Sequence, residues 1–278
     1  MRLIVLLAVA SAAHPESIGK SPSHVAHAAK ERLACFEETD AEQAAAFAKA
    51  DFLDAQAFEI DFHMRNKWRQ SSAFLQSSKR IFRSWGFALD AFSGKVVIDV
   101  GAGSRMRGAV LEGARLVAVE PMGHVLLNAI AKERAKGPEA ASKVAHMDFF
   151  NPRVVWRLFA QPAELRLCAV EGMADLAYTI NAIDHAYDPR RIVHNMARTL
   201  RHTCDSRMVV DVDLEHAPHT GHPHSLTRAG LQGWFESATP VLRVLNYTES
   251  RIVFDKKWPG KHGTWMLGRR YARDGSAC

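Results

Sequence analysis

The sequence predicts an α/β fold in which a doubly wound sheet of about seven strands follows an N-terminal helical extension. Three observations lead to this prediction. Short apolar runs rich in β-branched residues alternate with helical stretches, the pattern of parallel strands joined by crossover helices. A glycine-containing turn directly follows the first of these runs, and a carboxylate ends the second. Both features are typical of sheets that bind a ligand at the carboxyl ends of their strands.

The composition of the 278 residues is that of a globular protein, with 47% hydrophobic and 24% charged residues. These values exclude a disordered chain and a collagen-like repeat. No apolar run reaches the roughly 18–20 residues that a membrane-spanning helix needs, so no membrane span is expected. The four cysteines include no Cys-x-x-Cys pair, which leaves a zinc or redox motif of that kind without support.

Residues 1–13 have the layout of a secretory signal peptide, with one basic residue, an apolar stretch and small residues suited to cleavage. The alternative is a buried strand with a small-residue ending. A signal peptide at residues 1–13 would direct the protein into the secretory pathway, and otherwise a cytoplasmic location is expected. Residues 14–60 are interpreted as a linker followed by a helical extension rich in Ala and Glu.

The net charge of +6 is unevenly distributed, because residues 61–95 hold seven basic and two acidic side chains. A basic segment beside a site would attract an anionic substrate. The sequence favours the simpler interpretation, a solvated helix face. No basic run carries interleaved aromatic residues, so nucleic-acid binding is not expected.

The first strand is expected at residues 96–100 (VVIDV), whose apolar and β-branched character is typical of a strand buried on both faces. Gly101 and Gly103 come next, and glycines let the backbone turn sharply and approach a ligand closely. Asp99 would be costly to bury unless it is hydrogen-bonded. It is therefore expected either to cap the loop or to serve the ligand site.

A second buried strand at residues 115–119 ends at Glu120. A carboxylate at this place accepts hydrogen bonds from ribose hydroxyls in dinucleotide-binding folds. Glu120 lies 19 residues after Gly101 (120 − 101), which is about the spacing that this role requires. A dinucleotide-binding loop would have a third glycine where Met106 stands, so the sequence gives little support to a nicotinamide oxidoreductase.

Residues 99–104 (DVGAGS) and 119–121 (VEP) together resemble the first and second motifs of class I S-adenosylmethionine-dependent methyltransferases. Residues 182–189 (AIDHAYDP) resemble the turn after the fourth strand in the type-11 branch of these enzymes. The resemblance covers roughly residues 60–255. The sequence departs from the family pattern at residues 204–206, where Cys-Asp-Ser replaces the usual glycine pair.

The resemblance implies a Rossmann-like methyltransferase domain over residues 61–278, with S-adenosylmethionine as cofactor. It implies that Gly101, Gly103 and Glu120 contact that cofactor. Asp99 would hold the glycine loop or the methionine end of the cofactor.

Two further cofactor contacts follow from the same resemblance. Residues 157–164 are similar to the third strand and the acidic loop beside the adenine, which would make Glu164 a contact. Asn181 ends the fourth strand, residues 175–181, and is either a cofactor contact or a turn residue.

The remaining elements complete the expected sheet. A helix over residues 190–200 starts with Pro189 at a first helical position, and the fifth strand follows at residues 208–214. Residues 241–254 and 263–271 would supply the antiparallel final strands.

His185 is the candidate catalytic residue, because it follows the fourth strand and would face the methyl-bearing side of the pocket. Alignment of donor and acceptor supplies most of the acceleration in an in-line displacement. An oxygen or nitrogen acceptor must also lose a proton, and histidine is suited to accept it. The alternative is a histidine that only shapes the turn.

Four histidines, at positions 216, 219, 222 and 224, follow the fifth strand within nine residues. Their spacing suits a loop, and no thiolate or helical His-x-x-x-His pair accompanies them, so no metal site is predicted. We expect this loop to lie over the acceptor pocket, where residues 222–224 would make polar contacts.

The four cysteines are not expected to form a disulfide framework. Cys168 and Cys204 lie in expected core segments and are interpreted as inert thiols. Cys35 and Cys278 lie near the ends and would pair only in an exported protein whose ends meet.

The function predicted from the resemblance is methyl transfer to the oxygen or nitrogen of a small-molecule acceptor. The alternative is a non-catalytic protein that keeps the fold and binds S-adenosylmethionine, because a fold alone does not prove activity. The sequence names neither the acceptor nor an oligomeric state.

Overall fold

The computed structural model describes residues 59, 62–63, 72–144, 155–218, 222–252 and 260–278. The candidate signal peptide, residues 1–13, lies outside the described residues, as does almost all of the predicted helical extension. Both therefore stay predictions. None of the helices in the described ranges is long and apolar enough to cross a membrane.

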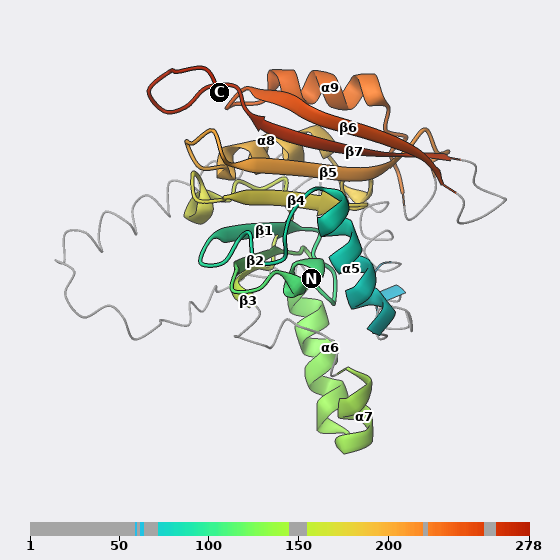
Figure 1. Ribbon diagram of the computed structural model, residues 1–278. Helices are drawn as coiled ribbons and strands as arrows, with labels where there is room; N and C mark the ends of the chain where they lie inside the picture. Colours follow the sequence, from blue (N-terminus) through green and yellow to red (C-terminus); the bar gives the residue numbers. More distant parts are fainter. Residues whose placement is uncertain (1–58, 60–61, 64–71, 145–154, 219–221, 253–259) are drawn as a thin grey trace, which may run out of the picture. The chain divides into compact units, whose positions relative to one another are not determined.

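Seven strands form a single mixed sheet in the order β3-β2-β1-β4-β5-β7-β6 (Figure 1). β1 to β5 are parallel, and β7 pairs antiparallel with both β5 and β6. The fold class predicted from the sequence is thus confirmed. The strands are β1 Val96–Val100, β2 Arg115–Val119, β3 Val155–Phe159, β4 Leu176–Ile180, β5 Arg207–Leu214, β6 Leu242–Ile252 and β7 Gly260–Arg269.

The strand boundaries follow the sequence most closely at the centre of the sheet. β1 and β2 coincide with the predicted ranges, because apolar β-branched runs there are buried over their whole length or nearly so. β3 starts two residues earlier than predicted, at Val155, and ends at Phe159, so Glu164 lies in the loop that follows it. At the other edge, β7 begins at Gly260, three residues before the prediction.

The register brings the carboxyl ends of the central strands to one edge of the sheet. Val100 at the end of β1 pairs with Val119 of β2 on one side and with Thr179 of β4 on the other. The loops that follow these three strands therefore start side by side. That edge carries the site described below.

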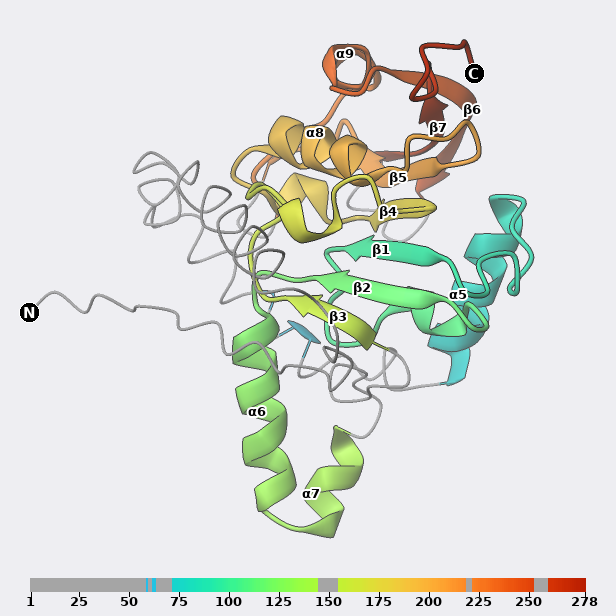
Figure 2. The same ribbon diagram turned by 90° about the vertical axis from the view of Figure 1, so that its left-hand side faces the viewer.

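Helices cover both faces of the sheet (Figures 1 and 2). One apolar core joins α8 and α9 to side chains such as Ile98, Ala177 and Val210. The other joins α5 and the 3-10 turn η1 to the alternate side chains, among them Val97, Tyr178 and Val209. The helical elements are α5 Ser72–Ser84, η1 Arg107–Val110, α6 Gly123–Ala135, α7 Pro138–Lys143, η3 Cys168–Val170, η4 Ile183–His185, α8 Pro189–Thr199 and α9 Arg228–Ser237.

Helix α8 shows why the predicted range 190–200 was close. The Asp188 side chain accepts a hydrogen bond from the Arg191 backbone amide at 3.1 Å, and Pro189 occupies the first helical position. Three apolar side chains at helical spacing, Ile192, Val193 and Met196, are buried against the sheet. The start of α8 in turn fixes the end of the turn that carries His185.

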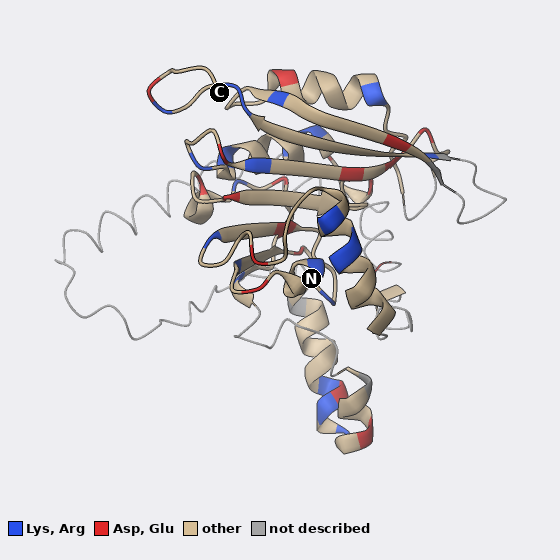
Figure 3. Ribbon diagram, viewed as in Figure 1, with Lys and Arg blue, Asp and Glu red and all other residues tan. Residues whose placement is uncertain are grey.

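Helix α5 accounts for part of the basic segment. Phe74, Ser78 and Phe82 are its buried positions, while Arg80 and Arg83 are exposed. The basic residues of α5 are the blue segments of that helix in Figure 3. This distribution agrees with a solvated helix face.

The prediction that Cys168 and Cys204 are free, inert thiols is wrong. Cys204 forms a disulfide with Cys278, with their Cα atoms 5.2 Å apart. The bond joins the loop before β5 to the end of the chain, so a Cys35–Cys278 pair is excluded. Cys168 is also disulfide-bonded. Spacing along the chain gave no sign of these contacts, because each cysteine meets its partner only through the fold.

Candidate active site

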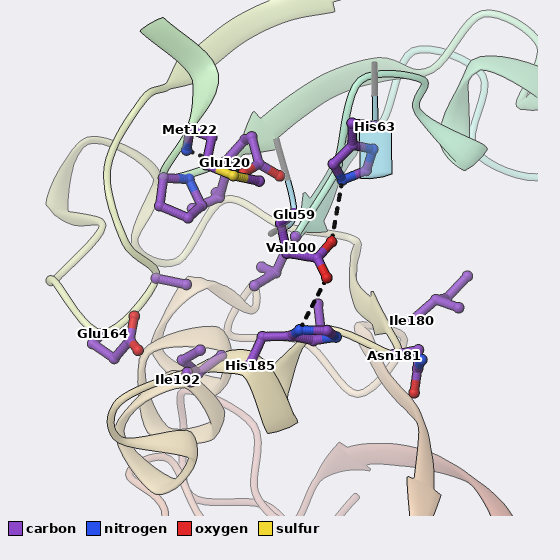
Figure 4. Close-up of a pocket in the computed structure, with 16 residues that line it drawn as sticks. Glu59, His63, Val100, Glu120, Met122, Glu164, Ile180, Asn181, His185 and Ile192 are labelled. Atoms are coloured by element: carbon purple, nitrogen blue, oxygen red, sulfur yellow. Dashed lines mark hydrogen bonds and ion pairs between the residues drawn. The ribbon is translucent and has the colours of Figure 1, made fainter. Parts of the chain in front are cut away.

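A cavity opens at the carboxyl ends of β1, β2 and β4 (Figure 4). Its wall includes five of the residues predicted from the sequence: Gly101, Glu120, Glu164, Asn181 and His185. They come from four separate loops, which the parallel strand order brings together.

The turn after β1 needs glycine for two reasons. Gly101 has a φ of +71°, a conformation that is strained for other residues. A Cβ atom at this position would lie 2.2 Å from the Cβ atom of Ala182, so the turn after β1 touches the turn after β4. The bare backbone of Gly101 thereby forms part of the cavity wall.

Glu120 holds the same loop in place. Its carboxylate is buried, with an exposed fraction of 2% for the residue, and lines the cavity. Oε2 accepts a hydrogen bond from the Gly103 amide at 2.8 Å, and Oε1 accepts one from the Met122 amide at 3.1 Å. A carboxylate offers about four acceptor positions, and these two amides occupy two of them. Gly103 itself is not one of the residues that line the cavity.

Asp99 lies beneath the loop rather than in the cavity wall. Its carboxylate accepts a short hydrogen bond from the Tyr178 hydroxyl, in the core that contains α5. Burial raises the pKa of Asp99 to about 6, although the bond from Tyr178 opposes the shift. In this position Asp99 supports the loop from behind.

Glu164 and Asn181 lie on opposite sides of the cavity (Figure 4). The Glu164 carboxylate is buried and accepts a hydrogen bond from the Tyr187 amide at 3.0 Å. Burial raises its pKa to about 7. Asn181 has a φ of +48°, and its Oδ1 accepts a hydrogen bond from the Asp213 amide at 3.3 Å. The asparagine side chain therefore joins the turn after β4 to the end of β5.

The raised pKa of Glu164 predicts a pH-dependent effect of its removal. The ordinary value of 4.5 applies to the unfolded chain, so the carboxyl group favours folding below pH 4.5 and this contribution is lost as pH rises through about 7. We expect Glu164→Gln to be more stable than the native protein at pH 8, by about 2–3 kcal/mol relative to any difference at pH 4.5. Urea unfolding at the two pH values measures the difference.

The matched control for this experiment is Glu112→Gln, because Glu112 is exposed and lies outside the cavity wall. Its unfolding free energy should follow that of the native protein at both pH values. Parallel curves for Glu164→Gln and the native protein would contradict the raised pKa.

His185 meets two residues that the sequence did not suggest. Its Nδ1 lies 3.4 Å from Glu59 Oε1, and the other oxygen of Glu59 lies 3.7 Å from His63 Nε2 (Figure 4). The ring of His63 then contacts the hydroxyl of Ser104 in the loop after β1, with Nδ1 and Oγ 3.2 Å apart. Glu59 was assigned to the helical extension, where no spacing or motif distinguished it from its neighbours.

Behind His185 lies a second polar cluster. The carboxylate of Asp184 has no exposed surface and receives contacts from the imidazoles of His216 and His222. Burial by itself would raise the pKa of Asp184, but these two hydrogen bonds outweigh it and hold the pKa well below its usual value. The rings of His185 and His222 are 4.1 Å apart between centroids. The histidine-rich loop thus reaches the cavity through His185, and His222 and His224 are not in the cavity wall.

Comparisons with known proteins agree with this architecture. No protein-family model and no curated protein sequence matches the chain. The structure is similar to phosphoethanolamine N-methyltransferase 2 of Haemonchus contortus, solved with phosphomonomethylethanolamine and S-adenosylhomocysteine. The TM-score is 0.50 at 11% identity, over 81% of this chain and 59% of that one. The chain has a class I methyltransferase fold.

Two other solved structures are similar at lower TM-scores. An S-adenosylmethionine-dependent methyltransferase from Aquifex aeolicus gives a TM-score of 0.48 at 11% identity, over 76% of this chain and 97% of that one. The YcgJ protein from Bacillus subtilis gives 0.46 at 13% identity, over 71% and 99%.

Proposed function

We propose that this protein is an S-adenosylmethionine-dependent methyltransferase that methylates an oxygen or nitrogen atom of a small-molecule acceptor. The observation that carries the proposal is that Gly101, Glu120 and His185 line one cavity at the carboxyl edge of the sheet. Gly101 would let the cofactor approach the backbone closely, and Glu120 would bind the ribose hydroxyls. His185 would accept the proton. The resemblance of residues 182–189 to the type-11 turn supports the same assignment for the loop that carries His185.

The residues of the cavity fit S-adenosylmethionine in their chemistry. Gly101 contributes only backbone to the cavity wall, which lets a ligand approach the main chain there. Glu120 would accept hydrogen bonds from the ribose hydroxyls, and Glu164 would accept one from the amino group of the adenine. The apolar wall between them includes Val119, Ala163 and Ile192, which suits the faces of an adenine ring.

When bound, S-adenosylmethionine supplies an electrophilic methyl group on a sulfonium sulfur. The protein's own part is to align the acceptor and to take up its proton. We assign the proton to His185 Nε2, because Nδ1 lies 3.4 Å from Glu59 Oε1, whereas Nε2 lies farther, 3.8 Å, from its carboxylate neighbour, Asp184 Oδ1. The carboxylate of Glu59 would then stabilise the imidazolium that forms, and His63 on its other side would keep that carboxylate in position.

A non-catalytic binding protein is the competing proposal. It would use the same glycine turn and the same Glu120, and it would need no proton acceptor. The pairing of His185 with a carboxylate favours the enzyme, because such a pair is what a general base requires. A binding protein would take up the cofactor but produce no S-adenosylhomocysteine with any acceptor.

The proposal is tested first by ligand-induced stabilisation. S-Adenosylmethionine and S-adenosylhomocysteine at about 100 times their Kd should each stabilise the protein by about 2.7 kcal/mol, since both bind only the folded state. Thermal unfolding with each ligand, and with NAD for comparison, measures the effect. NAD should leave the melting temperature unchanged.

Glu120→Gln should weaken the binding of both ligands roughly 10–100-fold, which corresponds to the loss of a hydrogen bond to a charged group, about 1.5–3 kcal/mol. Isothermal titration compares it with Glu112→Gln, which makes the same change of charge at an exposed position. Stabilisation by NAD alone, or equal affinities in the two variants, would overturn the proposed cofactor site.

A further inference from the structure

We propose that Asp184, His216 and His222 form a binding site for a divalent transition-metal ion of the zinc type. The inference stands on the geometry of the cluster and does not depend on the proposed methyl transfer. Each of the three side chains offers one ligand atom, and these atoms all lie within 4.8 Å of one another. Two imidazoles and one carboxylate are a donor set that Zn²⁺ takes up in proteins, with a further position left for water or substrate.

The distances within the cluster suit a tetrahedral ion. Zinc binds nitrogen and oxygen ligands at about 2.0–2.2 Å, which places neighbouring ligand atoms of a tetrahedron about 3.3 Å apart. His216 Nε2 lies 3.3 Å from Asp184 Oδ2, and His222 Nδ1 contacts the same oxygen at shorter range. His222 would have to move outward from that oxygen to reach the ligand spacing of a tetrahedral ion, and its side chain is 20% exposed.

The hydrogen bonds around His216 direct the correct nitrogen toward the cluster. Its Nδ1 is 3.3 Å from the carbonyl oxygen of Ala217, so the N–H on Nδ1 donates to that carbonyl. Nε2 faces the Asp184 carboxylate at 3.3 Å and donates to it when the ring is protonated. A metal ion at this place would take the position of the Nε2 proton. A backbone carbonyl that fixes the tautomer of a ligand histidine is a regular feature of zinc sites.

Asp184 supplies the negative charge that such a site needs. Its carboxylate has no exposed surface, and Oδ1 lies 3.8 Å from His185 Nε2, beyond hydrogen-bonding distance. A buried carboxylate requires compensation by a cation or by several donors. The sequence did not reveal this ligand, because Asp184 precedes His216 by 32 residues (216 − 184) and belongs to the turn after β4.

The site would lie directly behind the wall of the cavity. The ring of His185, next to Asp184 in η4, lies tilted against the ring of His222, with centroids 4.1 Å apart. His224 Nε2 donates to the carbonyl oxygen of Ala186 at 2.6 Å and holds the histidine-rich loop against the same turn. A bound ion would therefore fix the loop after β5 and the turn that carries His185 to each other.

The experiment is metal binding by the full-length protein after removal of bound metal with a chelator. We expect one equivalent of Zn²⁺ to bind with high affinity, and one equivalent of Co²⁺ to give the intense visible absorption of a tetrahedral site. His216→Ala and His222→Ala should each weaken Zn²⁺ binding by more than the roughly 10–100-fold that the loss of a second-shell partner causes. Both side chains are partly exposed, so these variants should fold, which circular dichroism verifies.

His202→Ala is the matched control, since His202 is exposed and lies outside the cluster. It should bind zinc as the native protein does. The proposal is overturned if the native protein binds no stoichiometric Zn²⁺, which would leave a proton as the cation between His216 and Asp184. It is equally overturned if His216→Ala and His222→Ala bind zinc as tightly as His202→Ala.

Discussion

Gly101→Ala should lower the free energy of unfolding by about 2–5 kcal/mol and abolish the binding of S-adenosylmethionine. Two effects add at this position. An alanine at a φ of +71° is strained by about 1–2 kcal/mol, and overpacking in a filled interior costs about 1–3 kcal/mol more. The overpacking arises because the new Cβ atom would lie 2.2 Å from the Cβ atom of Ala182, and neither backbone can retreat without moving a strand end. Urea unfolding and isothermal titration measure the two consequences.

Gly94→Ala separates strain from overpacking. Gly94 has the same φ of +71°, and a Cβ atom there would meet nothing within 4 Å. This variant should lose only the strain energy, about 1–2 kcal/mol, and should bind the cofactor normally. Equal losses in the two variants would mean that the turns after β1 and β4 move apart freely, and the close contact between them would then have no role in shaping the cavity.

His185→Ala should lower the turnover number by about 10²–10⁴-fold, the usual contribution of a general base. The affinity for the cofactor should change little, because the imidazole acts on the acceptor. If His185 is the proton acceptor, turnover of the native protein should rise with pH as its imidazole loses its proton. The measurement needs an acceptor, which a mass-spectrometric screen of metabolites for cofactor-dependent methylation would supply.

Three readouts on His185→Ala distinguish a proton acceptor from a structural histidine. If His185 only shapes the turn, cofactor affinity and thermal stability should fall together with turnover. If turnover is unchanged and binding intact, His185 has no part in the reaction and alignment alone accounts for it. The zinc content of the variant should equal that of His202→Ala, because His185 is outside the three proposed metal ligands.

The sheet could be predicted from the sequence because its central strands are short, apolar and β-branched, and the turns between them contain glycine and carboxylate. The face of the sheet to which the Asp99 side chain points could not be predicted. All five residues of β1 are buried, so the strand shows no alternation of polar and apolar residues to indicate which face each side chain joins. The structure places Asp99 on the Tyr178 side, beneath the loop.

Contacts between distant segments could not be predicted from the sequence either. Glu59 meets His185 across 126 positions (185 − 59), and Cys204 meets Cys278 across 74. In the sequence Asp184 stood out only as part of the turn motif at residues 182–189. It lies near His216 because β4 and β5 are neighbours in the sheet. The alternation of side chains along one strand is local and leaves a repeating pattern in the sequence. The contacts between distant segments depend on the topology of the whole sheet.

The amides that already bind Glu120 also limit how selective the site can be. A buried polar group left with no partner makes a site reject the wrong ligand about 10⁴-fold or more. Glu120 keeps its hydrogen bonds from the amides of Gly103 and Met122 whichever ligand is present. An analogue without the ribose hydroxyls therefore does not leave the carboxylate without a hydrogen-bond partner. Such an analogue loses about one charged hydrogen bond, roughly 10–100-fold in affinity. Deoxyribose analogues should therefore remain usable competitors for this protein.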